Sequence, residues 1–179
     1  MERLWSPWRL EYVTGTSSKA DVGCVFCTEQ DLPEADSLIV YRGSRCYVIL
    51  NRYPYNPGHL MALPNRHVPA LGDLSVEELH ELADLTKLSE AALLSAYRPQ
   101  GINVGINLGL SAGAGIREHL HVHLVPRWSG DTNFISVVGN TRVLPEELHQ
   151  SALRLRPVFR ELAERNLAGN TLAERDLAG

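Results

Sequence analysis

The chain has 179 residues, a length typical of one domain that can bury a core without disulfide bonds. Hydrophobic residues make up 44% of the chain and charged residues 21%, which argues against a disordered or fibrous protein. The net charge of −4 and the lack of any run of five Lys or Arg residues exclude the charge pattern of a protein that grips a nucleic-acid polymer.

The cysteines and the first residues bear on the location of the protein. Three cysteines do not make the even-numbered framework of a small secreted domain, so a reducing compartment is expected. The first residues carry charges and proline where a signal peptide needs an apolar core. No apolar run approaches the roughly 20 residues of a membrane span. We therefore expect a cytoplasmic protein without a membrane segment.

An irregular N-terminal segment, residues 1–36, precedes the first regular pattern. Runs rich in β-forming residues at 38–41 and 46–50 predict a hairpin. A third strand is expected at 59–63, after a turn at 53–58 that contains two prolines and a glycine. These runs predict three neighbouring antiparallel strands.

A long helix is expected next, over residues 76–97. Ser75 and Glu78 have the spacing of a capping box, in which the hydroxyl and the carboxylate each accept a bond from an unpaired amide at the helix start. Apolar residues recur at helical spacing after it, and Pro99 forbids continuation. The apolar face of this helix should cover one side of the sheet.

Strict alternation predicts two more strands. Over 102–108, Ile, Val, Ile and Leu alternate with Asn and Gly, which predicts a half-buried strand with Asn107 pointing away from the core. A loop of small residues at 109–115 leads to an alternating strand at 119–126.

The C-terminal part is expected to be helical. A second helix should begin near Pro145, a residue favoured in a first helical turn, and Pro157 is expected to kink or divide it. We expect a single domain over residues 1–165, followed by a C-terminal tail at 166–179.

Three histidines share one face of the last predicted strand. His119, His121 and His123 alternate with apolar residues, so one face carries imidazoles and the other faces the core. A solvated polar face would explain one such histidine, whereas three in register favour a function. One zinc ion is not expected to bind all three, because His119 and His123 start about 13 Å apart and zinc holds nitrogen at about 2.0–2.1 Å.

The three histidines are therefore expected to have different roles. A histidine at one end of the row would bind a metal, and the others would remain free for catalysis. A neutral imidazole can attack phosphorus through its unprotonated nitrogen when its other nitrogen donates to a fixed acceptor. A second imidazole nearby can donate a proton to the leaving oxygen.

The run His-Leu-His-Val-His-Leu-Val at 119–125 resembles the motif of the histidine-triad (HIT) family. The segment Leu50–His59 is similar to the ribose-binding strand and turn of the fragile-histidine-triad branch, and the resemblance covers about residues 1–140. Three further segments resemble the actinobacterial diadenosine-tetraphosphate phosphorylases of this family, at 3–12, 107–113 and 123–131.

The resemblance implies a fold and an activity. The fold is α+β, with a five-stranded antiparallel sheet and two main helices, paired into a homodimer with a continuous ten-stranded sheet. The implied activity cleaves a phosphoanhydride in a dinucleoside polyphosphate, with His121 as the nucleophile that forms a nucleotidyl-histidine intermediate. His123 would contact the phosphate and assist the leaving group.

The acceptor decides the products of this implied reaction. With inorganic phosphate, diadenosine tetraphosphate gives ADP and ATP, whereas with water it gives AMP and ATP. The flanking similarity favours phosphorolysis, with hydrolysis and phosphoramidate cleavage as alternatives.

The resemblance also implies a nucleotide site. Asn51 matches the family position that holds ribose hydroxyls, and His59 and Asn107 match positions that line the phosphate site. Small residues allow close approach of phosphate oxygens to backbone amides, which is expected at Gly113, Ala114 and Gly115. Where the family often has a polar side chain before the triad, this chain has Ile116-Arg-Glu.

A zinc site is the further implication. The spacing Cys24-x-x-Cys27 is shared by zinc sites, redox pairs and inert pairs. Zinc-bearing members of the resembled family complete a Cys₂His₂ site with histidines that match His67 and His119. One structural zinc ion is therefore expected, and it could supply about 10 kcal/mol or more of folding free energy to the unpatterned segment 1–36.

Two other functions remain open at this stage. A nucleotide-binding interaction protein with little turnover would keep the nucleotide site without needing a nucleophile. A zinc hydrolase would need an open metal position, which four protein ligands do not leave.

The remaining aromatic, histidine and cysteine residues are expected to be structural. Trp5 and Trp8 are expected to pack, with stacking on a base as the alternative. His80 and His149 are expected at the surface, and Cys46 as a small core or surface side chain.

Overall fold

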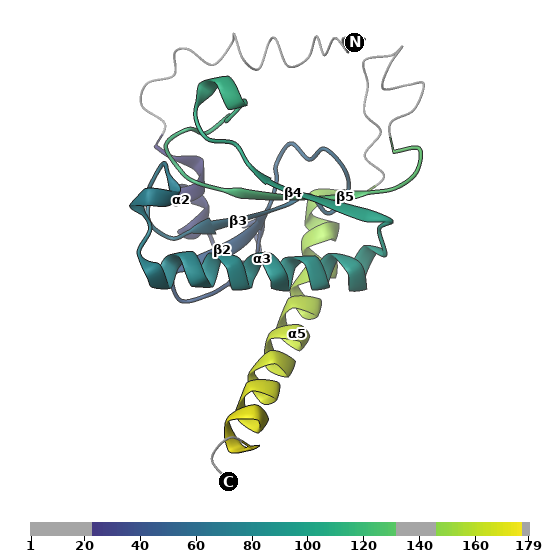
Figure 1. Ribbon diagram of the computed structural model, residues 1–179. Helices are drawn as coiled ribbons and strands as arrows, with labels where there is room; N and C mark the ends of the chain where they lie inside the picture. Colours follow the sequence, from purple (N-terminus) through teal and green to yellow (C-terminus); the bar gives the residue numbers. More distant parts are fainter. Residues whose placement is uncertain (1–22, 132–145, 177–179) are drawn as a thin grey trace, which may run out of the picture.

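The computed structural model describes residues 23–131 and 146–176 (Figure 1). Trp5, Trp8 and Pro145 lie outside the described residues. Within the described part of the chain, no helix combines the length and the apolar character needed to cross a bilayer.

Five antiparallel strands form one sheet in the order β1-β2-β3-β5-β4. This confirms the sheet implied by the resemblance to the histidine-triad family. The strand bounds are β1 Ile39–Arg42, β2 Cys46–Leu50, β3 Leu60–Pro64, β4 Gly101–Ile106 and β5 Val122–Arg127.

Helix α3, Val76–Tyr97, has the predicted bounds and the predicted capping box. Glu78 N donates to Ser75 Oγ at 3.2 Å, and Ser75 N donates to a carboxylate oxygen of Glu78 at 2.8 Å. Figure 1 shows α3 lying across one face of the sheet, where it contacts β2, β3 and β5. The sulfur of buried Cys46 lies 3.5 Å from the carbonyl oxygen of Glu78, so the side chain of Cys46 faces α3.

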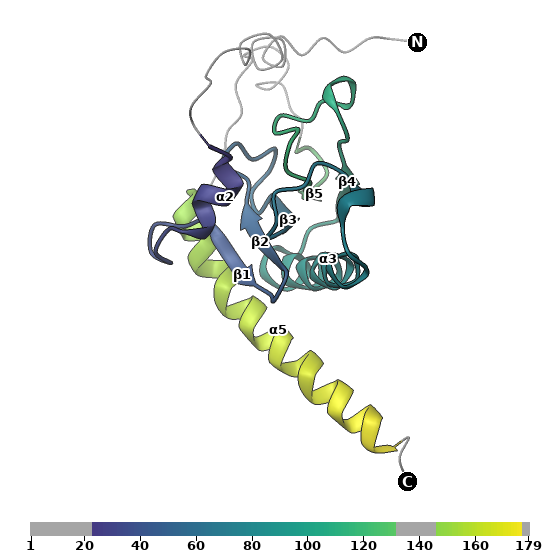
Figure 2. The same ribbon diagram turned by 90° about the vertical axis from the view of Figure 1, so that its left-hand side faces the viewer.

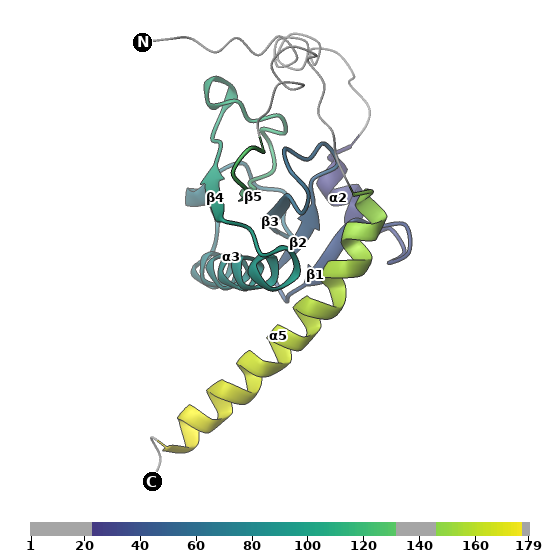
Figure 3. The same ribbon diagram turned by 90° about the vertical axis from the view of Figure 1, so that its right-hand side faces the viewer.

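Helix α5, Leu148–Asp176, packs on β1 and α3 with its first turns and then extends away from the sheet (Figures 2 and 3). Of the two expected effects of Pro157, a kink or a division, the division is wrong, since α5 is continuous through this residue. Fully buried Leu155 and Phe159 pack on either side of the proline and hold the helix to the core. The helix also continues through residue 166, where a tail is expected to begin.

The structure corrects two expectations about strands. The strand predicted at 102–108 buries its apolar face only in part: Ile102 and Ile106 of β4 pack against the core, whereas Val104 is 53% exposed, and Leu108, beyond the end of β4, is 47% exposed. The reason is the sheet order, because β4 is an edge strand and the helices pack mainly on the other four strands. The predicted strand at 119–126 begins at Val122, so the alternation of residues 119–121 continues in irregular backbone.

A short helix that the sequence analysis did not predict, α2 (Val25–Gln30), lies inside the irregular N-terminal segment. Polar groups attach it to the sheet: the Tyr47 hydroxyl donates to the carbonyl oxygen of Phe26 at 2.8 Å. The carboxylate of Glu29, a buried residue, binds Arg52 at 2.7 Å and accepts from the amide of Leu38 at 3.3 Å. These bonds act together with the buried Phe26 to hold the segment against the sheet.

Replacing Gly58 with alanine is expected to destabilise the fold. Gly58 has φ +75°, and a Cβ atom there would lie 2.8 Å from Cε2 of the Tyr97 ring. Left-handed strain and this overlap together should lower the free energy of unfolding by about 2 kcal/mol. Urea unfolding measures the change. Gly72→Ala is the matched control, since a Cβ there meets none of the described residues within 4 Å, and equal losses in both variants would contradict the expected role of Gly58.

Candidate functional site

The strand register gathers polar residues on the sheet face that points away from α3. On β5, His123 pairs with Met61 of β3 on one side and with Gly105 of β4 on the other. His59 lies two residues before Met61 and is therefore the diagonal neighbour of His123 on the same face. The amide of Asn51 donates to the carbonyl oxygen of His59 at 2.9 Å, which places Asn51 opposite His59. Three strands and the end of β2 thus contribute to one site.

His121 is held with one nitrogen ready for nucleophilic attack. Its Nδ1 lies 2.8 Å from the carbonyl oxygen of His119, and a carbonyl only accepts, so Nδ1 carries the proton. The buried environment lowers the pKa of His121, against a smaller opposing effect of this hydrogen bond, and so favours the neutral ring. Nε2 of the neutral ring is unprotonated. The fixed acceptor expected for the other ring nitrogen is thus the carbonyl oxygen of His119. His121 is only 5% exposed, which does not fit the alternative of a solvated polar face.

His123 is held in the opposite tautomer by a chain of hydrogen bonds. The amide of Tyr55 donates to His59 Nδ1 at 3.1 Å, so the proton of the His59 ring is on Nε2. His59 Nε2 in turn lies 3.0 Å from His123 Nδ1 and donates to it. Nδ1 of His123 is therefore an acceptor, and its proton is on Nε2. Burial, with a smaller effect of His121, lowers the pKa of His123 to about 4, so the ring is neutral at pH 7.

The two rings together offer complementary chemistry. The ring centroids of His121 and His123 are 4.8 Å apart, with planes at 81°. One ring has an unprotonated Nε2 and the other a protonated Nε2. A nucleophile beside a hydrogen-bond donor is the arrangement needed to attack phosphorus and to stabilise the oxygen that departs.

The other end of the triad forms a separate cluster of possible metal ligands. Ligand atoms of four residues all lie within 4.8 Å of one another: Cys24, Cys27, His67 and His119. His119 Nε2 donates to the carbonyl oxygen of Pro64 at 2.9 Å, so its Nδ1 is unprotonated. That nitrogen lies 3.4 Å from the sulfur of Cys24 and 3.7 Å from that of Cys27. His67 Nδ1 lies 3.5 Å from the sulfur of Cys27.

These separations fit a tetrahedral metal site. Zinc bonds of about 2.3 Å to sulfur and about 2.0–2.1 Å to nitrogen place tetrahedral sulfur and nitrogen ligands about 3.6 Å apart. The three sulfur–nitrogen distances are 3.4, 3.5 and 3.7 Å. Two sulfur and two nitrogen donors are a ligand set that zinc prefers. The four residues therefore form a ligand set that could hold a metal ion.

Helix α2 connects the metal-ligand cluster to the triad. Cys24 is the N-cap residue of α2 and Cys27 lies in its first turn. Phe26, between them, is buried, and its ring packs 5.4 Å from His119 and 5.3 Å from His121. The helix that carries the two cysteines of the cluster thus also packs against His121.

The remaining predicted site residues are Asn107 and the loop residues Gly113, Ala114 and Gly115. Asn107 follows Ile106, which pairs with Val122, so Asn107 lies at the same end of the sheet as His121. The amides of Gly113 and Ala114 donate to carbonyl oxygens of their own loop, at 3.0 and 3.3 Å. A phosphate that binds these two amides must compete with those bonds, whereas the neighbouring Gly115 is exposed.

Sequence reasoning missed several groups that set the state of the histidines. The Tyr55 amide and ring are one example: the ring stacks on His59 with centroids 4.8 Å apart. Phe26 is another, although its place between the two cysteines was a signal. The backbone acceptor at Pro64 has no signal in the sequence. His80 and His149 are exposed and Cys46 is buried in the core, which confirms their expected locations.

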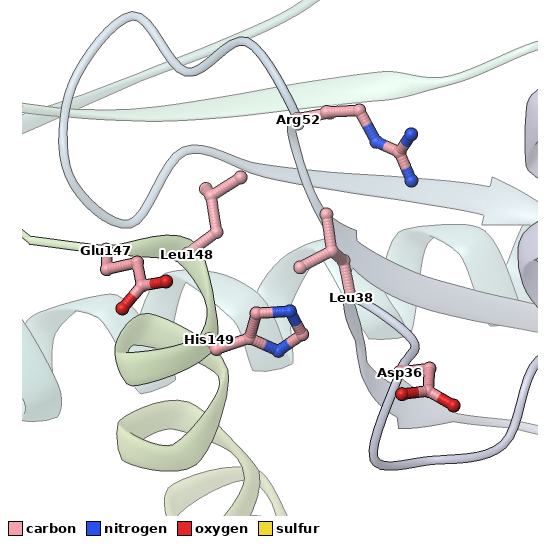
Figure 4. A pocket seen from close by; sticks show the side chains of 6 residues that line it. All are labelled: Asp36, Leu38, Arg52, Glu147, Leu148 and His149. Carbon is pink, nitrogen blue, oxygen red and sulfur yellow. The ribbon is translucent and has the colours of Figure 1, made fainter.

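A surface cavity of about 260 Å³ lies near the start of α5 (Figure 4). Its lining contains none of the triad histidines and consists of Asp36, Leu38, Arg52, Glu147, Leu148 and His149. The Arg52 guanidinium is engaged with Glu29 of α2. The candidate site is therefore defined by the histidine and cysteine clusters and not by this cavity.

Comparison with known proteins finds a matching domain family and similar proteins of named activity. A model of the HIT domain matches residues 32–130. The chain is 43% identical over 157 residues to "AP-4-A phosphorylase" of Mycobacterium tuberculosis, which covers 84% of this chain and 80% of that protein. It is 30% identical to "Bis(5'-adenosyl)-triphosphatase" of Dictyostelium discoideum, over 70% of this chain and 87% of that protein.

A solved structure is also similar. A Zn-bound histidine triad family protein from Mycobacterium smegmatis superimposes with a TM-score of 0.64 at 27% identity, covering 80% of this chain and 97% of that one.

His123 should remain neutral well below the usual range of histidine. Its ring is expected to titrate near pH 4, because burial and neighbouring His121 disfavour the charged form. Since the unfolded chain binds this proton near pH 6.5, the group should also make folding less favourable as the pH falls from 6.5 towards 4. NMR titration of the histidine rings measures the midpoint, with the urea-unfolded chain as the reference. A midpoint at or above 6.5 in the folded protein would contradict this assignment.

Proposed function

Because this chain belongs to the HIT family, we propose that it is a dinucleoside polyphosphate phosphorylase that converts diadenosine tetraphosphate and inorganic phosphate into ATP and ADP. The observation that carries the proposal is the pair of opposite tautomers in His121 and His123, one offering a lone pair and the other an N–H donor. The 43% identity to an AP-4-A phosphorylase supports the choice of substrate and acceptor.

The first step forms a covalent intermediate. Nε2 of His121 attacks the α-phosphorus of diadenosine tetraphosphate, and a P–N bond forms as the P–O bond to the rest of the chain breaks. ATP is the leaving group, and the Nε2 proton of His123 stabilises its departing oxygen. The carbonyl oxygen of His119 accepts from Nδ1 of His121, so it stabilises the positive charge that develops on this ring.

The second step transfers the nucleotidyl group. An oxygen of inorganic phosphate attacks the same phosphorus, the P–N bond breaks, and ADP leaves with Nε2 of His121 restored. Hydrolysis is the second candidate reaction, in which water takes the place of phosphate and AMP forms. The 30% identity to a bis(5'-adenosyl)-triphosphatase favours it over phosphoramidate cleavage.

The proposed nucleotide site surrounds these two histidines. Asn51 would hold the ribose hydroxyls, since it lies opposite His59 at the end of β2. His59 and Asn107 would line the phosphate site together with the backbone of Gly113, Ala114 and Gly115. Gly105, beside His123, adds no side chain to this face.

We propose zinc as the ion of the four-ligand cluster. Cys24, Cys27, His67 and His119 would hold it, and its contribution would be structural, tying α2 to the residue that precedes the nucleophile. The Zn-bound histidine triad protein at TM-score 0.64 supports this choice. Four protein ligands leave no open position, which argues against a zinc hydrolase.

Two further proposals concern assembly and location. The homodimer with a ten-stranded sheet is supported by edge strand β4, whose Val104 is more than half exposed, and by exposed Leu108 and Leu110 beyond it. The cytoplasm is the proposed location, because the thiols of the cluster need a reducing compartment.

Replacing His121 with alanine should abolish turnover while nucleotide binding survives. Loss of the nucleophile should lower kcat for diadenosine tetraphosphate by about a thousandfold or more. The affinity for AMP, measured by calorimetry, should remain within about threefold, since Asn51 and His59 are unchanged. Chromatography of the products with and without phosphate identifies the acceptor, and wild-type protein should produce ADP together with ATP.

His80→Ala is the matched control for this experiment, because His80 is exposed on α3. Undiminished turnover in His121→Ala would reject the mechanism. Binding of AMP without turnover in the wild-type protein would favour the interaction-protein alternative.

Metal analysis should find one zinc ion per chain in protein purified without chelator. Cys27→Ser should lose most of this zinc and unfold at a lower temperature, because one of four ligands is removed. Cys46→Ala, a core cysteine outside the cluster, is the matched control and should retain zinc. Metal-free wild-type protein with unchanged stability would overturn the zinc proposal.

A further inference from the structure

The turn between β2 and β3 carries the residues that set the His123 tautomer. Tyr55 supplies the amide that fixes His59, and the amide of His59 closes the turn on the carbonyl oxygen of Asn56 at 3.1 Å. Tyr53 is 76% exposed and its amide donates to the side-chain oxygen of Asn51 at 2.9 Å, so hydrogen bonds rather than packing hold the outer part of the turn. His59 itself is fully buried and its carbonyl oxygen accepts from the amide of Asn51, so what depends on further bonds of the turn is the placement of the Tyr55 amide against the His59 ring.

The side chain of Asn56 provides such bonds. Its Nδ2 donates to the carbonyl oxygen of Pro126 at 2.8 Å and to a carboxylate oxygen of Asp131 at 2.9 Å, so both amide protons are used. Pro126 lies on β5, three residues after His123. The turn that holds His59 is thus attached to the same strand that carries His123.

The carboxylate of Asp131 is itself held by neighbouring residues. Arg127 makes a two-point contact with its carboxylate, at 2.6 and 2.9 Å, and Trp128 N donates to it at 3.3 Å. Arg127 also donates to the side-chain oxygen of Asn103 on β4 at 2.8 Å. These charge-assisted bonds hold the carboxylate against Asn56. They lower the pKa of Asp131, so the carboxylate stays ionised.

We propose that the Asn56–Asp131 bond, with the Asn56–Pro126 bond, positions His59 against His123 and thereby decides which nitrogen of His123 carries its proton. Asn56 and Asp131 are positioning residues, since both act through His59. When the link is broken, the turn can move, and His123 Nδ1 loses its donor. The proton can then reside on either nitrogen of the ring.

The catalytic consequence rests on the proposed function. A His123 ring with its proton on Nδ1 presents a lone pair at Nε2 and cannot donate to the departing oxygen. Turnover should then fall in kcat, while KM changes little, because the groups proposed to bind ribose and phosphate are retained. The tautomer itself is a property of the free protein and does not depend on the reaction.

The experiment compares Asn56→Ala and Asp131→Ala with wild-type protein. Nitrogen-15 chemical shifts of the His123 ring, which differ between a protonated and an unprotonated nitrogen, report the tautomer at pH 7. We expect wild-type His123 to have an unprotonated Nδ1, and both variants to show a mixture. The value of kcat for diadenosine tetraphosphate should fall about tenfold in each, with KM within about twofold.

Two more variants separate positioning from general stability. Asp131→Asn keeps an acceptor for Asn56 and should restore the wild-type tautomer. Asn65→Ala is the matched control, because Asn65 Nδ2 donates to Ser44 O, in the loop that joins β1 and β2. Urea unfolding checks that each variant is folded. If Asn56→Ala does not fold, the comparison uses Asp131→Ala alone.

The outcomes are distinguishable. An unchanged His123 tautomer in a folded variant without the link overturns the inference, whatever the activity. A shifted tautomer with an undiminished kcat supports the link and overturns its catalytic consequence, because His123 would then act without a fixed proton position. A shifted tautomer in a protein that shows no turnover even as wild type supports the link and rejects the proposed phosphorylase function instead.

Discussion

The hydrogen bond from His121 Nδ1 to the carbonyl oxygen of His119 is the contact on which the site depends. Through its backbone, His119 fixes the proton of His121, and through its side chain it faces two cysteine sulfurs. One residue thus belongs to both clusters. A chain can in this way place the proposed metal ligand and the proposed nucleophile two residues apart without mixing their roles, since a ring nitrogen serves the first and a backbone acceptor the second.

The fold was predictable where its signals are local. The capping box of Ser75 and Glu78 and the stop at Pro99 depend on neighbouring residues, and α3 has the expected bounds. The exposure of Val104 was not predictable in this way. Alternation identifies a strand and its two faces, but whether a helix covers the apolar face depends on the place of β4 at the sheet edge.

The candidate site shows the same division. The histidine positions were evident from the sequence, and the structure brings Cys24, Cys27, His67 and His119 together as the family resemblance implied. The proton positions of His119 and His123 were not evident, because partners outside the motif set them. The carbonyl oxygen of Pro64 sets the proton of His119. The amide of Tyr55 sets that of His123 by way of the His59 ring. Such partners are backbone atoms, which every residue has, so a pattern of side chains in the sequence cannot predict them.

Gly105 illustrates how the edge of the sheet can serve ligand access. It pairs with His123, and among the residues that the structure describes, a Cβ built on it would meet no atom within 4 Å. A larger side chain at this position would therefore overlap none of the described residues, while it would stand next to the His123 ring. Size at residue 105 would in that way influence which molecules can reach the histidine more than it influences the packing of the strand.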